Sequence, residues 1–370
     1  MVEVISNQQS LAPLKEQWNA LANLQQSPLL AFDWFVSCIE TIHAADPLRI
    51  VVVREGDKLY AIAPLCVVQK KGIATLELIG TAILYEPSGF LYADQPSLQR
   101  LLDGIIQLGL PLDLLRLPDN PLLHACLRKL AWRKAILLVR QSAPSAFLQL
   151  PADWEIFLAT LSSNRRYDFR RKQKCLEKAG QVTSRIITPT LAEFPALLQA
   201  ALVVEDKSWK GQRGSSLLKN TTLLAFFERY TRKACEAGSL RLCFIELDGK
   251  PISMHIAIAS HGSFWVLKLG FDEAFSKCSP GAQLAMDTIE YSVRQGLSGY
   301  EFLGSAESWQ QAWPIEEHAC FTALLYPYSF AGLGGLSAFL LFYSKKLLTR
   351  WLAFVRSYFL GKFSAKNETK

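Results

Sequence analysis

The sequence predicts a mixed α/β protein of two similar lobes, in which mixed sheets are flanked by helices. The chain has 370 residues, which exceeds the roughly 250 to 300 residues that one hydrophobic core usually serves. Half of its residues are hydrophobic, so a disordered chain is excluded. A hairpin pattern also occurs twice, about 190 residues apart, which indicates an internal duplication.

The first half begins with a short apolar strand and two helical segments. Leu14, Trp18 and Leu21 follow one another at helical spacing, and residues 27–42 form the second helix-like segment. Residues 48–72 then hold two apolar runs around a Glu-Gly-Asp turn. Alternation of this kind around a turn signal is typical of a β-hairpin.

The second half repeats the hairpin and adds a strand-loop-helix-strand unit. The hairpin occupies residues 240–262 and has an Asp-Gly turn. The unit that follows comprises a strand (263–275, ending near Gly270), a loop (276–283), a helix (about 281–295) and a strand (299–304).

The start of the helix at about 281–295 has the features of a phosphate site. Unsatisfied backbone N–H groups and the positive end of the helix dipole can together hold a pyrophosphate. Lys277 adds a positive charge, and Gly281 and Ala282 let a phosphate group approach closely. An ordinary helix start, with Pro280 in the first position and Ser279 as its cap, has the same pattern. The sequence leaves both interpretations open.

Residues 161–180 predict an unusually basic helix. They contain seven Lys or Arg and two acidic residues. Serine and asparagine at 162–164 can cap its start and Gly180 can end it, so the helix is expected over 164–179. It is either a solvated face or an anion-binding face. The arginines that would bind the anion are Arg165, Arg166, Arg170 and Arg171.

The basicity of the chain is local. Of the net charge of +7, residues 161–180 contribute +5 (seven basic, two acidic) and residues 345–370 contribute +6 (seven basic, one acidic), so the rest sums to −4. Two patches, and not a field over the whole surface, would meet anionic partners.

Several classes of protein are disfavoured. The N-terminus lacks the charged start and apolar core of a secretory signal, which predicts a cytoplasmic protein. The eight cysteines include no CxxC pair and the five histidines no HExxH, so we expect buried free thiols and no metal. A GxSxG elbow and a GxGxxG fingerprint are also lacking, which disfavours a hydrolase and a dehydrogenase.

Several segments together carry a resemblance to a known family. Besides the two hairpins, they are "FDWF" (32–35), "LSSNRRYDFRRKQKCLEKAG" (161–180), "EDKSWKG" (205–211), "LGFDEAFSKCSPGAQL" (269–284) and "YEFLGSAESWQQAW" (300–313). Over about residues 1–328 the chain resembles the CelD-type acyltransferases of the GNAT superfamily, named for cellulose biosynthesis. That group is similar to the Fem-type peptidyltransferases in having two GNAT folds in tandem. The lobes are accordingly expected at 1–145 and 146–328, with a tail at 329–370.

The resemblance implies that acyl-CoA, above all acetyl-CoA, enters a split between two parallel strands. Here these strands would be Trp265–Gly270 and Tyr300–Gly304, with the pyrophosphate on the loop Ser276–Gln283. No metal is needed for this chemistry. The residues implied for binding the donor are Leu267, Leu269, Ser276, Lys277, Ser279, Gly281, Ala282 and Gln283.

Two carboxylates are the candidate catalytic residues. Glu307 follows the last strand of the unit and could act as a general base or only cap a turn. Asp272 could orient the substrate or only form a turn. The family pattern usually reads Glu, any residue, Tyr, Lys, but here Trp309 and Gln310 replace the Tyr and Lys. The chain therefore lacks the general acid and the anion-binding lysine that the resemblance would place there.

A second set of residues would bind the acceptor or the 3′-phosphate end of CoA. Trp209 and Lys210 lie in a polar, glycine-rich stretch, which more often marks a ligand surface than a core. The four arginines of the basic helix would contact either phosphate groups of the acceptor or the 3′-phosphate of CoA.

The tail predicts contact with a membrane surface. Residues 336–360 combine leucines and aromatic residues with Lys345, Lys346, Arg350 and Arg356, a pattern typical of a basic amphipathic helix on an anionic bilayer. A terminal helix packed on the protein's own core and a transmembrane anchor remain alternatives. Pro327 and the glycines at 332–335 argue against one clean spanning helix.

The sequence thus predicts a cytoplasmic acyltransferase, peripheral on the inner membrane face, that moves an acyl group to an amine or hydroxyl of a sugar, glycan or lipid-linked precursor. One alternative is a Fem-like transferase that uses aminoacyl-tRNA, for which the basic helix would contact nucleic acid. The other is a non-catalytic, membrane-associated scaffold.

Overall fold

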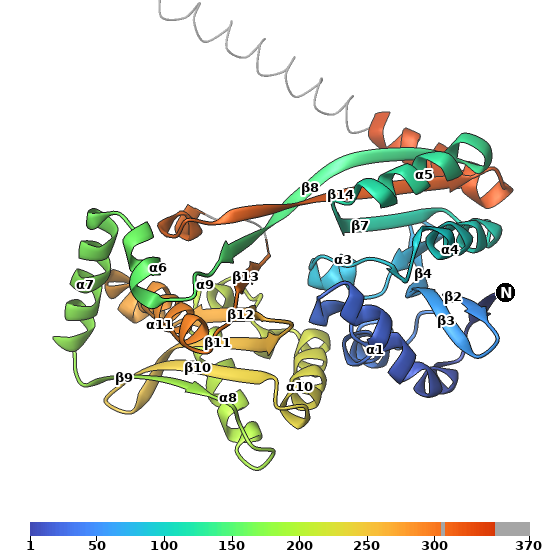
Figure 1. Cartoon of the computed structure of the whole chain (residues 1–370). Coiled ribbons are helices and arrows are strands. Elements are labelled where there is room, and N and C mark those ends of the chain that lie inside the picture. The colour runs from blue at the N-terminus through green and yellow to red at the C-terminus, as the bar shows by residue number, and fades with distance from the viewer. Residues whose placement is uncertain (305–307, 345–370) are drawn as a thin grey trace, which may run out of the picture.

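Two lobes lie side by side and share one long sheet (Figure 1). The computed structural model describes residues 1–304 and 308–344. Within this part of the chain a ten-stranded sheet has the order β4-β5-β7-β14-β8-β13-β12-β11-β10-β9, and a four-stranded sheet has the order β1-β2-β3-β6. Helices flank both sheets, so the mixed α/β fold expected from the sequence is confirmed.

The first half of the chain forms the lobe at the right of Figure 1. The hairpin predicted at 48–72 is confirmed, since β2 and β3 pair across the turn from Glu55 to Lys58. The elements of this half are β1 (Val2–Ile5), α1 (Lys15–Leu24), α2 (Phe32–Thr41), β2 (Ile50–Glu55), β3 (Lys58–Ala63), β4 (Leu65–Lys70), β5 (Ile73–Leu78), α3 (Thr81–Leu84), β6 (Leu91–Tyr92), α4 (Gln95–Gln107), β7 (Leu112–Pro118), α5 (Pro121–Lys134) and β8 (Ala135–Gln149).

The second half forms most of the other lobe. Its predicted hairpin is β10 and β11, which pair across the turn from Leu247 to Lys250. The elements are α6 (Trp154–Thr160), α7 (Ser163–Glu177), β9 (Val182–Ile187), α8 (Phe194–Asp206), α9 (Trp209–Gln212), α10 (Thr221–Glu236), β10 (Leu240–Leu247), β11 (Lys250–Ser260), β12 (Ser263–Phe271), the 3-10 helix η5 (Glu273–Cys278), α11 (Pro280–Arg294), β13 (Gly299–Leu303), the 3-10 helix η6 (Ser308–Ala312) and β14 (Glu316–Pro327).

The two halves repeat one unit. In the first half β5 and β7 are parallel neighbours with α4 between them in the chain, and in the second half β12 and β13 are parallel neighbours with α11 between them. Each half then continues into a long strand, β8 or β14. The internal duplication predicted from the hairpins therefore extends to the parallel pair and its helix.

The lobes exchange these long strands. β8, from the first half, pairs with β13 of the second, and β14, from the second half, pairs with β7 of the first. The two long strands also pair with each other over most of their length, as the ribbons across the top of Figure 1 show. The boundary expected between residues 145 and 146 falls inside β8, which serves both lobes.

An apolar contact between helices also joins the lobes. Trp34 on α2 packs against Phe226 and Tyr230 on α10, with ring centroids 5.1 and 4.9 Å apart. All three side chains are buried in one hydrophobic cluster that contains residues from both halves. Burial of large aromatic rings is strongly stabilising, so this contact fixes the lobes relative to each other.

A helix follows β14 and lies on the first lobe. Residues 330–344 are helical, and this helix includes the glycines at 332, 334 and 335 that had argued against one clean membrane-spanning helix. Gly335 lies so close to Pro111 that an added Cβ would be 2.5 Å from the ring. Within the described residues no helix is long and apolar enough to cross a membrane. The rest of the predicted amphipathic helix, residues 345–360, lies outside the described residues.

Candidate active site

The parallel pair β12 and β13 opens into a split. The two strands pair only from Ser263 with Gly299 to Trp265 with Glu301, although β12 continues to Phe271. The register between β11 and β12 also shifts just after Val266, which marks a β-bulge. Bulges redirect a strand and are frequent beside active sites. The split therefore lies where the sequence placed the donor, between the strands expected at 265–270 and 300–304.

The start of α11 has no side-chain cap. Ser279 has a left-handed backbone, with φ of 50°, and its hydroxyl caps no N–H group of the helix. Its carbonyl accepts the N–H groups of Ala282 and Gln283 at 3.1 and 3.2 Å. A Cβ at Gly281 would lie 3.0 Å from the Phe271 ring, so this glycine also serves the packing of the helix on β12. Of the two interpretations, the side-chain cap by Ser279 is not observed.

The segment before α11 is a 3-10 helix and is tied to the basic helix α7. Ser276 and Lys277 are exposed on η5, and the Lys172 ammonium donates to the Lys277 carbonyl at 3.0 Å. Cys175 on α7 and Cys278 on η5 form a disulfide. The basic helix therefore lies directly beside the start of α11.

The disulfide corrects one prediction. The sequence led us to expect free thiols, and the six other cysteines are indeed free and buried. Cys175 and Cys278 are 103 residues apart in the chain. Only the packing of α7 against η5 brings them together, and no short motif signals such a pair.

The four arginines of α7 divide into two groups. Arg165 donates to the Gln311 carbonyl and Arg166 to the Leu158 carbonyl, at 3.2 and 3.0 Å. Arg170 and Arg171, by contrast, line an open groove on α7 together with lysines and Tyr167. The second pair lines this groove, although Arg170 also donates to the Arg166 carbonyl at 3.3 Å and Arg171 pairs with Asp168 at 2.6 Å.

Lys210, Leu267 and Leu269 lie at the split. The Lys210 ammonium donates to the carbonyl of Leu269 at 2.8 Å, on the part of β12 that has left β13. Leu267 is buried and Leu269 is half-buried. Lys210 thus contacts the backbone of the strand that the sequence assigned to the donor.

Trp209 and Asp272 have more local contacts. Trp209 is half-exposed and stacks with Arg213, whose guanidinium lies 5.0 Å from the ring centroid. One oxygen of Asp272 accepts the Ala274 N–H and the other lies 3.3 Å from the Lys207 ammonium. Both oxygens of Asp272 are therefore engaged in capping η5 and in an ion pair.

The other candidate carboxylate, Glu307, lies outside the described residues. Trp309, which replaces the tyrosine of the family pattern, is described. Its ring packs against Phe302 and Trp313, with centroids 5.8 and 5.7 Å apart. It therefore contributes to the apolar core under β13 and supplies no acid.

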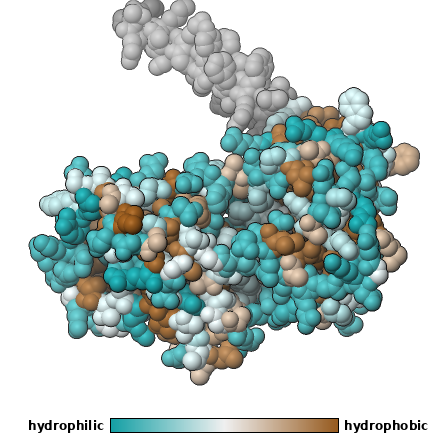
Figure 2. Space-filling model, viewed as in Figure 1, coloured by the Kyte–Doolittle hydropathy of each residue, from teal (hydrophilic) through white to brown (hydrophobic). Residues whose placement is uncertain are grey.

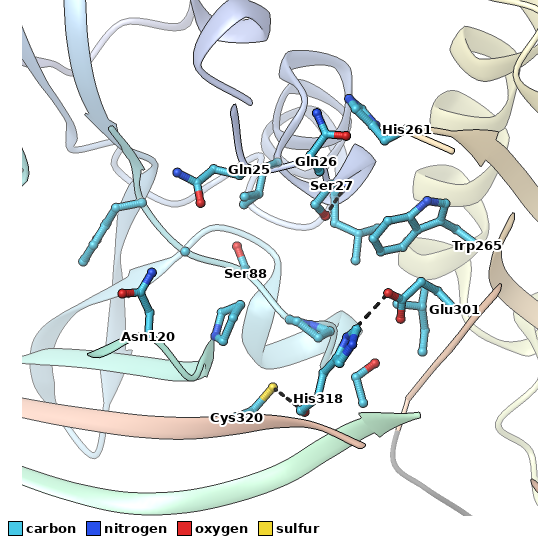
Figure 3. Close-up of a pocket in the computed structure, with 18 of the residues that line it drawn as sticks. Gln25, Gln26, Ser27, Ser88, Asn120, His261, Trp265, Glu301, His318 and Cys320 are labelled. Atoms are coloured by element: carbon cyan, nitrogen blue, oxygen red, sulfur yellow. Dashed lines mark hydrogen bonds and ion pairs between the residues drawn. The ribbon is translucent and has the colours of Figure 1, made fainter. Parts of the chain in front are cut away.

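A pocket between the lobes begins where the parallel pair ends (Figure 3). Its volume is about 390 Å³, within the range of small-molecule sites. Trp265, Glu301 and Leu303 come from the second half, and Ser88 and Asn120 come from the first. Trp265, Glu301 and Leu303 belong to the strands expected to bind the donor, but none of the described side chains proposed individually for catalysis or binding lines the pocket.

Glu301 is the buried acid of this pocket. It is 7% exposed, and burial raises the pKa of its carboxyl to about 8. One oxygen lies 3.6 Å from Nδ1 of His318, on β14. Burial lowers the pKa of His318, so both side chains are neutral near pH 7 and their contact is not an ion pair.

Two buried hydroxyls in the pocket lack partners. Ser88 and Ser145 are 5% and 2% exposed, and neither side-chain oxygen has a hydrogen-bond partner in the described part of the chain. Figure 3 shows the Ser88 hydroxyl directed into the pocket. Buried polar groups are nearly always satisfied, so these hydroxyls suit a polar ligand.

One group elsewhere has the composition of a metal site. His43, Asp46 and Cys66 bring three ligand-type atoms within 4.8 Å of one another. The Nε2 of His43 accepts the Gly80 N–H at 2.9 Å and its Nδ1 lies 2.8 Å from Asp46. Both ring nitrogens are thus engaged, and burial raises the pKa of the Cys66 thiol. We assign no metal to this group.

Comparison with known proteins agrees with this geometry. Residues 163–311, which contain the split and α11, match the family described as acetyltransferase (GNAT) domain. This part of the chain is therefore similar to GNAT-type acetyltransferase domains. No curated protein sequence matches the chain.

Solved structures show the same overall fold. FemX aligns with a TM-score of 0.57 at 11% sequence identity, over 88% of this chain and 97% of that one. The C-terminal domain of a putative lysylphosphatidylglycerol synthetase from Agrobacterium fabrum aligns with a TM-score of 0.54 at 11% identity, over 89% of this chain and 96% of that one. At such identities the likeness concerns the fold alone.

Glu301 is the candidate residue that the sequence analysis missed. The sequence contained a sign of its importance, because Glu301 is the one charged residue in the otherwise apolar strand "GYEFL". His318, Ser88 and Ser145 had none, since the exchange of long strands and the packing of the lobes bring them to the pocket.

Proposed function

We propose that the protein transfers an acyl group, above all acetyl, from acyl-CoA to an amine or hydroxyl of a sugar, glycan or lipid-linked precursor bound between the lobes. The observation that carries this proposal is the position of Glu301. It is the last residue of β13 to pair with β12, and its carboxyl faces the pocket between the lobes. The GNAT-type domain supports the class of reaction.

The residues around α11 fit the donor. The first turn of α11 has no side-chain cap, and a helix start of this kind stabilises phosphate groups. Lys277 and the arginines Arg170 and Arg171 of α7 would meet the phosphates of CoA. Ser276, Ser279, Ala282 and Gln283 would surround the pyrophosphate, while Leu267 and Leu269 would line the split for the pantetheine arm. The donor supplies an activated thioester carbonyl when bound.

Glu301 has the pKa of a general base for an amine. A pKa of about 8 lies near the working pH, where proton transfer by a side chain is most effective. In its carboxylate form Glu301 accepts a proton from the attacking amine or hydroxyl. The chemistry then requires no metal.

His318 provides a route for that proton. It lies beside Glu301 and its side chain is 52% exposed. Its ring stacks on Phe147, with centroids 4.5 Å apart, which holds one edge toward Glu301 and the other toward solvent. His318 would therefore pass the proton from the buried carboxyl to water.

The lining of the pocket favours an uncharged, hydroxyl-rich acceptor. Amide and hydroxyl groups dominate its polar side, and no Lys or Arg of the described residues lines it. The unpaired hydroxyls of Ser88 and Ser145 would be satisfied by hydroxyls of the ligand. Trp265 adds an aromatic wall. An amino sugar has the matching groups, which supports the sugar or glycan acceptor and makes a phosphate in this pocket unfavourable.

Two measurements test the proposal on the full chain. Calorimetry should show saturable binding of acetyl-CoA, and release of free CoA thiol should accelerate when glucosamine or another amino sugar is added. Absence of acetyl-CoA binding would remove the donor assignment and favour a non-catalytic scaffold. Binding without acceleration by any amino sugar would contradict the acceptor class.

A second candidate uses aminoacyl-tRNA as donor. It is favoured by the groove of Arg170, Arg171, Lys174 and Lys178 on α7 and by the fold shared with FemX. A mobility shift with tRNA, lost at high salt, together with no affinity for acetyl-CoA, would favour this candidate. The assignment to the CelD-type group rests on the sequence resemblance and remains part of the proposal.

A further inference from the structure

One end of the first lobe exposes an unusual set of large apolar side chains. We define the apolar patch as Trp132, Tyr328, Phe330, Leu333, Leu340 and Leu341. Phe330 is 100% exposed and Trp132 is 87% exposed. Figure 2 shows hydrophobic residues at this end, next to the point where the described chain stops. Clusters of this kind on a folded surface mark interaction sites.

Two neighbouring elements, the end of α5 and the segment after β14, contribute to the patch. The Tyr328 N–H donates to the carbonyl of Lys134, at the end of α5 and two residues from Trp132, at 3.0 Å. Figure 1 shows α5 and the helix at 330–344 at the same end of the molecule. The side chains at 330, 333, 340 and 341 recur at helical spacing, so they share one face of this helix.

The opposite face of the same helix is occupied. Gly332 and Gly335 are buried, Gly335 against Pro111, and Phe339 packs on Tyr326 with ring centroids 5.9 Å apart. The glycines allow this close approach. The apolar patch is therefore the face that remains after the helix has docked on its own lobe.

Basic residues lie beside the patch on α5, although the Lys134 ammonium is paired with Asp103 at 2.7 Å. α5 carries Arg128, Lys129, Arg133 and Lys134, all exposed, and no acidic residue. The chain continues beyond residue 344 for 26 residues, which carry seven basic residues and one acidic residue. Aromatic residues at 351, 354 and 359 are interleaved with these charges.

We propose that the apolar patch docks on an anionic lipid bilayer, with the flanking basic residues in the headgroup region. Tryptophan, phenylalanine and leucine beside lysine and arginine are the composition of interfacial membrane contacts. A nucleic acid would satisfy the charges but would leave the leucines in water. The surface attaches the first lobe peripherally and leaves the split and α11, in the second lobe, free to bind the donor.

The experiment is flotation of the full chain with vesicles, using a double variant of the folded surface. We expect co-flotation with mixed phosphatidylcholine and phosphatidylglycerol vesicles at low salt, and release at high salt. Trp132→Ser with Phe330→Ser should lower the partition coefficient about tenfold or more, since both rings leave the contact. The matched control is Ile156→Ser with Leu191→Ser, two exposed apolar residues of the second half, which should float as the unmodified protein does.

Four results would overturn the proposal. They are the absence of flotation at low salt, equal flotation of the Trp132 and Phe330 variant, retention through alkaline carbonate extraction, as for a spanning helix, and loss of self-association as the only effect of the variant. Circular dichroism of each variant confirms the fold, which these exposed positions should not disturb.

Discussion

The helices α4 and α11 occupy equivalent places in the two halves, but their first turns differ. Each lies in the chain between two parallel strands. α4 begins with a complete capping box, in which the Asp94 carboxylate accepts the Ser97 N–H at 2.8 Å and the Ser97 hydroxyl accepts the Asp94 N–H at 3.2 Å. α11 begins at Ser279 without any side-chain cap.

This difference supports the proposal that the donor binds in the second half. A carboxylate already occupies the positive end of α4 and would repel a phosphate, whereas the start of α11 remains available for one. The buried acidic residues on the first strand of one parallel pair and the second strand of the other also differ in whether they are paired. Glu77, on β5, pairs with Lys70 at 2.9 Å, whereas the partner of Glu301, on β13, among the described residues is a neutral histidine. At these two matched positions, the helix start and the strand acid of the first half are paired within that half, whereas those of the second half have no side-chain cap and no charged partner among the described residues.

The largest effect is expected at Glu301. Glu301→Gln removes the base while keeping the shape of the side chain, and should lower kcat by about 10²- to 10⁴-fold. In the unmodified protein kcat/KM should rise with pH through about 8, because the pKa of Glu301 is raised to that value by burial and only the carboxylate accepts a proton. The variant should lose this rise. Release of CoA thiol, followed from pH 6 to 9, measures both.

The matched control is Glu77→Gln, the paired acid of the first half. It removes one of the two carboxylates that pair with Lys70 in the described part of the chain, the other being Asp113. It should therefore lower the free energy of unfolding but leave the pH profile unchanged. Equal loss of activity in the two variants would contradict the distinction between the halves, and so would a Glu301→Gln variant with full activity.

The next effect concerns the start of α11. Ser279→Asp gives this helix a carboxylate like that of α4, and aspartate tolerates the left-handed backbone of this position. Repulsion of the pyrophosphate should weaken acetyl-CoA binding about tenfold to a hundredfold, as measured by calorimetry. Ser279→Asn is the neutral control and should bind normally. We prefer this position to Gly281, where a side chain would also strike Phe271.

A smaller effect is expected on α7. Arg170→Glu with Arg171→Glu should weaken acetyl-CoA binding roughly threefold to tenfold, since the groove is open to solvent and its charges are screened. Arg128→Glu with Lys129→Glu on α5 changes the net charge equally and should leave the affinity unchanged. An equal loss in both variants would mean that only the overall charge matters. Unchanged affinity in both would make α7 a solvated face.

The sequence predicted local structure well because the relevant signals are local. Turn residues and alternation located the hairpins, and caps and glycine located α7, which runs from Ser163 to Glu177 where 164–179 was expected. The strand-loop-helix-strand unit, including the start of α11, was predicted within a few residues. These features depend on neighbours in the chain.

The pocket could not be predicted, because its residues meet through topology. Ser145 lies on β8 and His318 on β14, and they reach Glu301 only because the lobes exchange these strands. The disulfide between Cys175 and Cys278 has the same origin. Glu301 itself could have been identified from the sequence, since burying an acidic side chain in an apolar strand is costly and such residues often have a function. The catalytic role of Glu307 stays a prediction, because this residue lies outside the described residues.

The smallest effect is expected at the cap of α4. Asp94→Ala removes the bonds to Ser97 and should lower the free energy of unfolding by about 1 kcal/mol, as measured by urea denaturation, without changing affinity for acetyl-CoA. The hydrogen bond from the Ser97 N–H holds the pKa of Asp94 below its ordinary value. A carboxyl of this kind stabilises the fold above its unfolded-state pKa, near 3.9, and loses that contribution as the pH falls through its lower folded-state value. The difference between Asp94→Ala and the unmodified protein should therefore be full at pH 7 and shrink below about pH 4. If Asp94→Ala instead altered acetyl-CoA binding, α4 would be part of a donor site, and the assignment of the donor to the second half alone would fail.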